Sequence, residues 1–436
     1  MSKAAAPLPM AHEGTDHLSL TVLGAGAIGN ILEWYDFGLY GLFAPLLAHL
    51  FFPAENRIAA LMSVYAGFAI GFVMRPIGGA VLGHLGDRIG RRFVLICSVV
   101  MMGITTAAMG LLPTYGAIGI GAPILLLLLR ILQGFSVGGE FTGSVAYLVE
   151  SAPQHRRGLA GSFANIGSTI GLLLASGLAA AATTFADPAL LQSWGWRIPF
   201  LFGGVIAACG FVLRARLGED DLSKPPASSR QKNALPLKRA LTEAPRAMFW
   251  TVLFTSGYGI VNYLSMVFLP TYASTFGGIA ESHALQINTA AQALALVVVP
   301  LAGWLSDHAI RRRTLLILVF IAEFGVAWIF FALAHSGGTA GFWLAQLSFG
   351  ALLALVMGSG PAMLSEQFKS DYRLSGYSLC FNIGIGIAGG TAPIIATWLI
   401  GRTGNLSAPA FYLMLASAVA AVAAYMLVDR SREPLP

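Results

Sequence analysis

The chain has 436 residues, of which 56% are hydrophobic and only 11% charged, and its formal net charge is +6. An ordinary soluble domain carries about 25% charged residues, so this chain has too little charge to cover the surface of a soluble protein of its size. The composition therefore excludes a water-soluble globular protein and indicates a chain embedded in a membrane.

Apolar stretches of roughly 20 residues recur along the whole sequence, the length that a helix needs to cross a hydrocarbon core about 30 Å thick. They predict an all-α membrane protein with twelve transmembrane helices. The predicted helices cover 20–50, 57–82, 93–113, 118–149, 158–184, 197–217, 246–275, 285–306, 314–335, 340–365, 375–401 and 408–428.

One long polar segment, rich in Pro, Ser and charged residues, divides these helices into two groups of six. We expect it to be a cytosolic linker between two six-helix bundles. The expected parts are an N-terminal tail at 1–19, a first bundle at 20–217, the linker at 218–245, a second bundle at 246–428 and a C-terminal tail at 429–436.

A short polar loop signature occurs once in each half. The sequence GHLGDRIGRR, with Asp87, Arg91 and Arg92, returns as GWLSDHAIRR, with Asp307 and Arg311, 220 residues later. Each copy separates two long apolar stretches. This repeat is typical of transporters that are built from two similar halves.

Lys and Arg are distributed very unevenly between the two sets of loops. With both termini on the cytosolic side, 21 of the 26 basic residues are cytosolic, three are external and two lie within the membrane. The positive-inside rule therefore predicts a multi-pass protein of the bacterial inner membrane with both termini in the cytosol. The net charge follows from this topology, so nucleic acid is not expected as a partner.

Gly24, Gly26 and Gly29 form a G-x-G-x-x-G pattern, which in another context would indicate dinucleotide binding. No acidic residue follows at the required distance, and the next segment is another apolar helix. Small residues that allow close helix packing are the better interpretation. No cofactor is expected, and no metal, because the three cysteines lie in apolar segments without metal-ligand spacing.

Four polar residues of the first helix, Asn30, Glu33, Asp36 and Tyr40, are three or four positions apart and so share one face. A carboxylate at the centre of a membrane costs about 2.5–3.5 kcal/mol, so this face should meet water or cations rather than lipid. Asp36 and Glu33 are the candidates for proton coupling.

Two arginines within predicted helices are the candidate cations. Arg75 and Glu140 lie roughly 12 and 15 Å from the cytosolic ends of their helices at 1.5 Å per residue, so we expect them to form a structural ion pair. Arg130 lies nearer the depth of Asp36. With its neighbour Gln133, Arg130 is the candidate ligand for a substrate carboxylate, because guanidinium binds carboxylate through two hydrogen bonds.

The second half contains fewer charges. Its Glu323 is expected to be a neutral structural carboxyl rather than a proton site. Side chains that could complete a substrate site by hydrogen bonding, together with Tyr40 and Asn30 of the first helix, are Tyr263, Asn262 and Asn382.

Four segments carry a resemblance to a known family: GNILEWYDFGLYG at 29–41, RPIGGAVLGHLGDRIGRR at 75–92, RILQGFSVGGEFTG at 130–143 and WGWRIPF at 194–200. They resemble the metabolite:H+ symporter family of the major facilitator superfamily, and most closely its proline/betaine branch. The likeness runs through all twelve segments and is most specific in the first half. The second loop copy departs from the family pattern at His308, Ala309 and Ile310.

The resemblance implies a conformational latch, in which the aspartate of the loop signature pairs with arginines and with the N-terminus of a neighbouring helix. The expected latch residues are Asp87, Arg91, Arg92, Asp307, Arg311, Glu150 and Arg157. It also implies substrates such as proline, betaine, 2-oxoglutarate, citrate or shikimate, which share a carboxylate.

The sequence thus predicts a monomeric, proton-coupled symporter that imports a small carboxylate-bearing or zwitterionic metabolite by alternating access, with protons, substrate and lipid as partners. A proton-coupled exporter of drugs or metabolites on the same fold is the first alternative. A membrane-bound NAD-dependent enzyme, based only on the glycine pattern, is the remote one.

Overall fold

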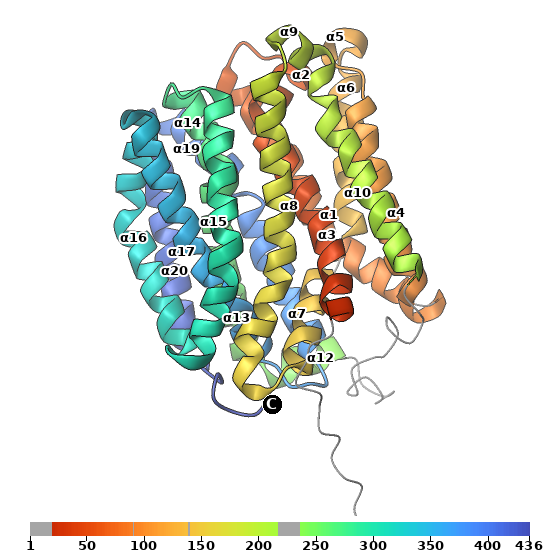
Figure 1. Ribbon diagram of the computed structural model, residues 1–436, viewed down its shortest axis with the longest axis vertical. Coiled ribbons are helices and arrows are strands. Elements are labelled where there is room, and N and C mark those ends of the chain that lie inside the picture. Colours follow the sequence, from red (N-terminus) through yellow and green to blue (C-terminus); the bar gives the residue numbers. More distant parts are fainter. Residues whose placement is uncertain (1–19, 90, 138–139, 217–235) are drawn as a thin grey trace, which may run out of the picture.

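The computed structural model describes residues 20–89, 91–137, 140–216 and 236–436 (Figure 1). Within these ranges it describes only the backbone at 20–28, 80, 83–84, 86–95, 140 and 213–216. All regular structure in the described residues is helical. A continuous helix runs from Leu20 to Leu42, so the glycine pattern lies in a membrane-type helix rather than in a strand–turn–helix unit.

Helices cover each of the twelve predicted segments. Those of the first half are α1 (Leu20–Leu42), α2 (Ala44–Phe51), α3 (Arg57–Ile89), α4 (Arg91–Leu111), α5 (Tyr115–Ile118), α6 (Gly121–Ser136), α7 (Glu140–Ser151), α8 (Arg157–Phe185), α9 (Pro188–Leu190) and α10 (Arg197–Arg216). Those of the second half are α12 (Pro236–Glu243), α13 (Pro245–Tyr263), α14 (Leu269–Phe276), α15 (Glu281–His308), α16 (Arg312–Ser336), α17 (Gly338–Ser365), α18 (Arg373–Phe381), α19 (Ala392–Thr403) and α20 (Ala408–Met426).

The described residues contain three π-helical stretches that the sequence did not indicate: Leu191–Gly195 lies just before α10, and the other two lie within spans of the second half. Leu264–Phe268 joins α13 to α14, and Asn382–Gly389 joins α18 to α19. The wider π turn leaves backbone groups less regularly paired, and such turns are common at functional sites. Of the expected linker, 236–243 forms α12, and the part before it is outside the described residues.

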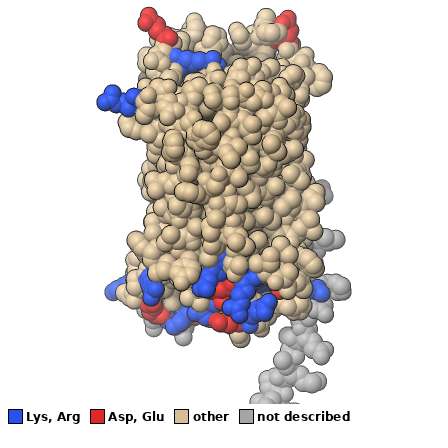
Figure 2. Space-filling view, turned by 90° about the vertical axis from the view of Figure 1, so that its left-hand side faces the viewer, with Lys and Arg blue, Asp and Glu red and all other residues tan. Residues whose placement is uncertain are grey.

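In the described residues, nine helices are long and apolar enough to cross a membrane, or ten if the bent pair Pro188–Gly195 and Arg197–Val212 is a single span. The apolar part of α4, Ile96–Leu111, is shorter. Charged side chains gather at the two ends of the molecule and leave a broad band without them, as expected for a multi-pass membrane protein (Figure 2).

Helices of the first half lie on one side of the molecule and those of the second half on the other, with α8 and α15 side by side between them (Figure 1). In the first half α1 packs against α8 and α3 against α6; in the second, α13 and α16 pack against α20. Glycine permits the closest approaches: a Cβ atom on Gly171 of α8 would lie 2.4 Å from the carbonyl oxygen of Ile31 in α1.

Candidate functional site

One buried ion pair lies entirely within the first half. The Asp36 carboxylate of α1 accepts a hydrogen bond from the Thr106 hydroxyl of α4 at 2.7 Å and lies 3.8 Å from the Arg130 guanidinium of α6. Arg130 also donates to Gln133 at 2.8 Å, and Gln133 donates to Thr106 at 3.1 Å. All four side chains are buried. They form a closed polar network in which the carboxylate and its cation share mid-helix positions.

Aromatic rings and α3 enclose Arg130 further. Its guanidinium carbon lies 4.2 Å from the ring centre of Tyr40 and 4.7 Å from that of Phe37. A Cβ atom on Gly71 would lie 2.9 Å from the Arg130 guanidinium. First-half residues make all of these contacts, and from the second half Tyr263 acts on Arg130 electrostatically.

A second buried pair joins Arg75 of α3 to Glu33 of α1. The sequence analysis expected Arg75 to pair with Glu140; the structure gives it a different partner, and the side chain of Glu140 is outside the described residues. Depth along a helix does not say which neighbouring helix a side chain faces. Arg75 and Glu33 are 3% and 1% exposed, so neither charge reaches solvent.

The Arg75–Glu33 pair adjoins the second half more closely than the Asp36 network does. Tyr263, the last residue of α13, packs against Phe72 with ring centres 5.1 Å apart and against Trp34 at 6.2 Å with nearly parallel rings. Arg75 and Glu33 both act electrostatically on the Tyr263 hydroxyl. The pair therefore lies at the interface between the halves, beside the π turn that follows Tyr263.

Three polar groups in this cluster have no hydrogen-bond partner among the described residues: Arg75 Nε, the Trp34 indole Nε1 and the Tyr263 hydroxyl. Each group is a donor. Buried donors without partners are unusual in folded proteins, and such a group often binds a ligand or water.

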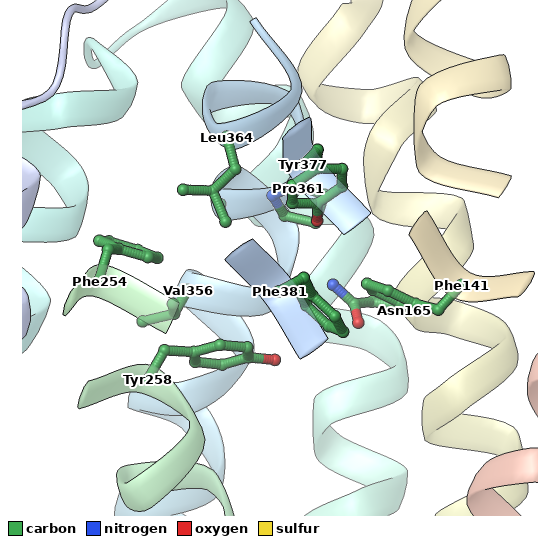
Figure 3. A pocket seen from close by; sticks show the side chains of 10 residues that line it. Phe141, Asn165, Phe254, Tyr258, Val356, Pro361, Leu364, Tyr377 and Phe381 are labelled. Carbon is green, nitrogen blue, oxygen red and sulfur yellow. The ribbon is translucent and has the colours of Figure 1, made fainter. Parts of the chain in front are cut away.

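Towards the end of the molecule that carries the C-terminal tail, an aromatic cavity lies between the halves. Phe141 and Phe381 stack across the interface at 4.7 Å, and Trp34 lies 6.4 Å from Phe141. The lining includes Asn165, Tyr258 and Tyr377 (Figure 3), and the space between them would hold about one water molecule.

The same end is closed by the second copy of the loop signature. The Asp307 carboxylate accepts hydrogen bonds from the backbone N–H groups of Gly158 and Leu159, both at 2.8 Å, and from Arg312 at 2.7 Å. Gly158 and Leu159 are at the N-terminus of α8, where a negative charge is favoured by the helix dipole. This contact joins the two halves.

Two further ion pairs join the halves here, Arg157 to Glu366 at 3.0 Å and Glu150 to Arg373 at 2.6 Å. Arg312 binds Glu366 as well, at 2.5 Å. Sequence reasoning chose Arg311, which is exposed, because it did not locate the start of α16: Arg311 precedes the helix, whereas Arg312 begins it and is buried. It also missed Glu366 and Arg373. The Asp87, Arg91 and Arg92 side chains are outside the described residues.

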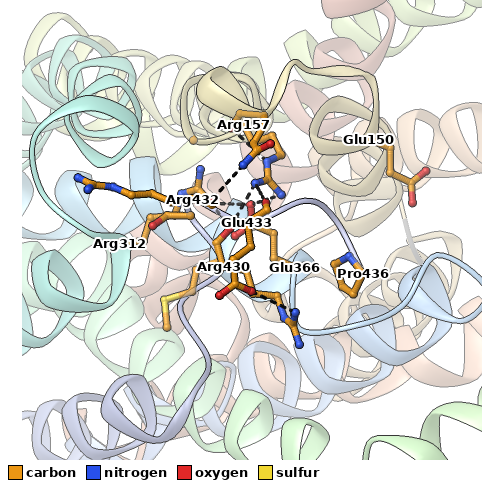
Figure 4. A network of polar contacts seen from close by, with 12 residues as sticks. Glu150, Arg157, Arg312, Glu366, Arg430, Arg432, Glu433 and Pro436 are labelled. Atoms are coloured by element: carbon orange, nitrogen blue, oxygen red, sulfur yellow. Dashed lines mark hydrogen bonds and ion pairs between the residues drawn. The ribbon is translucent and has the colours of Figure 1, made fainter. Parts of the chain in front are cut away.

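The C-terminal tail covers this network (Figure 4). Arg157 donates to the carbonyl oxygens of Arg430 and Glu433, and Arg373 donates to that of Pro436 at 3.0 Å. Asp429 accepts hydrogen bonds from the backbone N–H groups of Arg313 and Ser431. Partial burial raises the pKa of Asp429, but the hydrogen bonds lower it by more, so the pKa lies below its usual value.

At the opposite end, uncharged hydrogen bonds join α8 to α15. Ser176 lies 2.9 Å from the Thr289 hydroxyl and accepts from Asn288 at 3.1 Å, and Gln286 donates to Thr184 at 2.9 Å. The halves are thus in contact at both ends, and the two ion pairs of α1 are enclosed between them.

The remaining predicted residues have local roles in this conformation. Asn30 donates to the Ala164 carbonyl of α8, and Asn382 donates to Ser378 within its own span. Asn262 is buried next to Tyr263 in the chain. Glu323 of α16 is fully buried, and neither of its oxygens has a hydrogen-bond partner among the described residues.

Comparison with known proteins agrees with this architecture. The sequence model of the Major Facilitator Superfamily matches residues 26–379. The proline/betaine transporter of Escherichia coli strain K12 is 33% identical over 425 residues, which is 94% of this chain and 84% of the relative. A Staphylococcus aureus (strain COL) protein, provisionally named a proline/betaine transporter, is 36% identical over 92% of this chain and 86% of its own length.

Solved structures share the fold at lower identity. The crystal structure of a D-xylose-proton symporter matches 95% of this chain and 98% of that protein with a TM-score of 0.72 and 20% identity. The transporter FucP in its outward conformation matches 93% of this chain and 98% of that protein with a TM-score of 0.62 and 15% identity. The chain is therefore a multi-pass transporter and not an enzyme, and it belongs to the metabolite:H+ symporter family of the Major Facilitator Superfamily.

Proposed function

We propose that this protein is a proton-coupled symporter that imports a small carboxylate-bearing metabolite, with proline- and betaine-like zwitterions as the first candidates. The relatives named proline/betaine transporters support this substrate class, because they match more than 90% of the chain. The lysines and arginines support an orientation in the bacterial inner membrane in which the latched end and both termini face the cytosol.

The carrier would alternate between two openings by rocking its bundles, 20–217 and 246–428, around a central site. The contacts of Asp307, Arg157 and Glu150 would break when the cytosolic side opens. Those of Ser176 and Asn288 would break when the external side opens. Because both sets consist of a few ion pairs and hydrogen bonds, each can be broken without unfolding a bundle.

Asp36 is the proposed proton acceptor, and its buried pair with Arg130 is the observation that carries the proposal. Protonation would neutralise Asp36 and release Arg130, and so change the packing among α1, α4 and α6. Since those contacts all lie within the first half, Arg130 fits the role of counter-ion to Asp36 better than that of the substrate ligand suggested by the sequence. Glu33 is the alternative proton site.

The test is uptake into proteoliposomes, with proline, betaine, 2-oxoglutarate, citrate and shikimate offered in turn. Wild-type protein should accumulate one of the first two when a proton gradient is directed inward, and a protonophore should abolish accumulation. Asp36→Asn should lose gradient-driven accumulation but retain substrate exchange at equal pH, since exchange needs no net proton release. Undiminished accumulation by Asp36→Asn would remove Asp36 from the coupling role.

An exporter on the same fold is the competing proposal. A cation-selective drug cavity is disfavoured by two buried arginines near the centre, Arg75 and Arg130. Ethidium efflux driven by a proton gradient, without uptake of any carboxylate, would decide for the exporter.

A further inference from the structure

We propose that the Arg75–Glu33 pair is the substrate site, and that a zwitterion enters by separating the pair and giving each charge a new partner. The substrate carboxylate would bind Arg75 and its cationic nitrogen would face Glu33. The proposal rests on the proposed function in so far as it takes proline- and betaine-like molecules as candidate substrates.

The position of the pair is the first argument. Both buried ion pairs of α1 act on Tyr263 of the second half, but Arg75 and Glu33 act on it more strongly than Arg130 does. A transporter that alternates between two openings must bind its substrate where both halves can contact it. The hydrogen bonds and ion pair of the Asp36–Arg130 network all lie within the first half, and Tyr263 acts on Arg130 only weakly, so Arg75–Glu33 meets this condition better.

The unsatisfied donors are the second, independent argument. Arg75 Nε, Trp34 Nε1 and the Tyr263 hydroxyl are buried and have no hydrogen-bond partner among the described residues. A carboxylate is an acceptor with about four lone-pair sites, so it suits a cluster of donors beside a guanidinium. Trp34 and Tyr263 come from opposite halves, and a carboxylate bound by both would join α1 to α13.

The aromatic side chains near the pair suit the cationic nitrogen of a zwitterion. The Arg75 guanidinium lies 5.2 Å from the ring centre of Phe72. Tyr263 packs against Phe72 at 5.1 Å and against Trp34 at 6.2 Å. Faces of Trp and Tyr attract quaternary or secondary ammonium groups. The Glu33 carboxylate adds a full negative charge on the same side.

Charge balance then selects the substrate class. Separating a buried ion pair leaves two uncompensated charges, which is unfavourable unless both acquire new partners. A zwitterion supplies both in one molecule. A dicarboxylate or tricarboxylate satisfies only Arg75 and brings further negative charge towards Glu33, so 2-oxoglutarate and citrate should be rejected.

Two ligands of nearly the same shape test this directly. Betaine and 3,3-dimethylbutanoate differ in that the first has a cationic nitrogen where the second has a neutral carbon. Binding to the purified, detergent-solubilised full chain is measured by isothermal titration calorimetry at constant pH, so that no transport is required. Wild-type protein should bind betaine at least tenfold more tightly than the neutral isostere, and 2-oxoglutarate should not compete.

Single substitutions test which part of the ligand each charge of the pair binds. Glu33→Gln should reduce the preference for betaine over the isostere by about tenfold, and Arg75→Lys should weaken both ligands to a similar extent because each has the same carboxylate. Glu323→Gln is the matched control, because it makes the same change at another buried carboxyl outside the proposed site, and it should leave the preference unchanged. If Glu33→Gln does not fold, the comparison of the two ligands on wild-type protein still decides.

Equal binding of the isostere and betaine by wild-type protein, or an unchanged preference in Glu33→Gln, would overturn the proposal. Its failure is distinguishable from failure of the proposed function. Proton-driven uptake of a dicarboxylate would keep the symporter and remove this site, whereas charge-selective betaine binding without proton-driven uptake would keep this site and remove the symport.

Discussion

Two carboxylates three residues apart on α1 meet different partners. Glu33 pairs with Arg75 of α3, and Asp36 contacts Arg130 of α6 and Thr106 of α4. Three positions on an α-helix correspond to a rotation of about 300° and a rise of about 4.5 Å, so neighbouring side chains on one face still point towards different helices. In the proposed mechanism, the rigid backbone of α1 therefore links Glu33 at the substrate site to Asp36, the proton acceptor.

Arg130→Lys separates the counter-ion role from the substrate role. Lysine keeps the positive charge but cannot reproduce a planar guanidinium that donates to two oxygens at once. If Arg130 serves Asp36, the KM for substrate should change by less than about threefold, below the 1.4 kcal/mol that a tenfold change represents. Uptake kinetics in proteoliposomes provide the measurement.

The control for this variant is Arg75→Lys, which should raise the KM by about tenfold or more. The reverse ranking, with Arg130→Lys the more damaging to substrate affinity, would return Arg130 to the role that sequence alone suggested for it.

Which charges are buried could be predicted from sequence, but their pairing could not. Mid-helix positions identified Asp36, Glu33, Arg75 and Arg130, because charge in an apolar stretch is visible in the sequence. The direction in which each helix is rotated depends on packing with helices far away in the chain. The sequence does not contain that information, so it indicated neither Glu33 as a partner of Arg75 nor the burial of Arg312 in place of Arg311.

At the scale of single elements, α8 is in contact with the second half along its whole length. Its N-terminus binds the Asp307 carboxylate, and near its other end Ser176 lies against Thr289. Because α8 is rigid, moving one of its ends away from the second half also shifts its other end. The π turns after Tyr263 and at Asn382–Gly389 provide less regular backbone within the two facing spans, and the apolar pattern of the sequence gave no sign of them.

Gly158→Ala should weaken the latch at the N-terminus of α8. A Cβ atom there would lie 2.7 Å from Asp307 Oδ1 and 2.7 Å from the Gly303 carbonyl oxygen, so α8 and α15 must separate. The reporter is a cysteine introduced as Val356→Cys, which lines the aromatic cavity, in a chain whose native cysteines are replaced. Its alkylation from the latched side should accelerate about tenfold, the effect of about 1.4 kcal/mol on a two-state equilibrium.

Gly177→Ala is the control, because it makes the same change in the same helix. Its Cβ atom would meet only the Thr289 methyl group at 3.7 Å, an ordinary contact. Alkylation of Val356→Cys should then proceed as in the parent chain. Equal rates for the Gly158 and Gly177 variants would mean that the close contact at Gly158 does not hold this end closed.

At the scale of the whole molecule, the two ends are closed by different chemistry. The latched end uses ion pairs and a carboxylate at a helix N-terminus, with the tail bonded over them. At the opposite end uncharged hydrogen bonds join α8 to α15, and an attraction between Arg57 and Glu281 is added to them. Surface ion pairs weaken with salt, but buried ones are screened much less. Since Arg157 and Glu366 are both buried, ionic strength alone should not open the latched end.

A disulfide across the opposite end tests whether the closed contacts there must break during transport. The hydroxyl oxygens of Ser176 and Thr289 are 2.9 Å apart, so the pair Ser176→Cys and Thr289→Cys, in a chain without its native cysteines, places two thiols at the junction of α8 and α15. Oxidation should reduce uptake by at least tenfold, and a reductant should restore it. Each single variant treated with the same oxidant is the control.

Because oxidation holds only this end closed, alkylation of Val356→Cys from the latched side should persist. Full uptake by a chain shown on gels to be crosslinked would mean that α8 and α15 stay together throughout the cycle, and that the bundles do not rock about a central site.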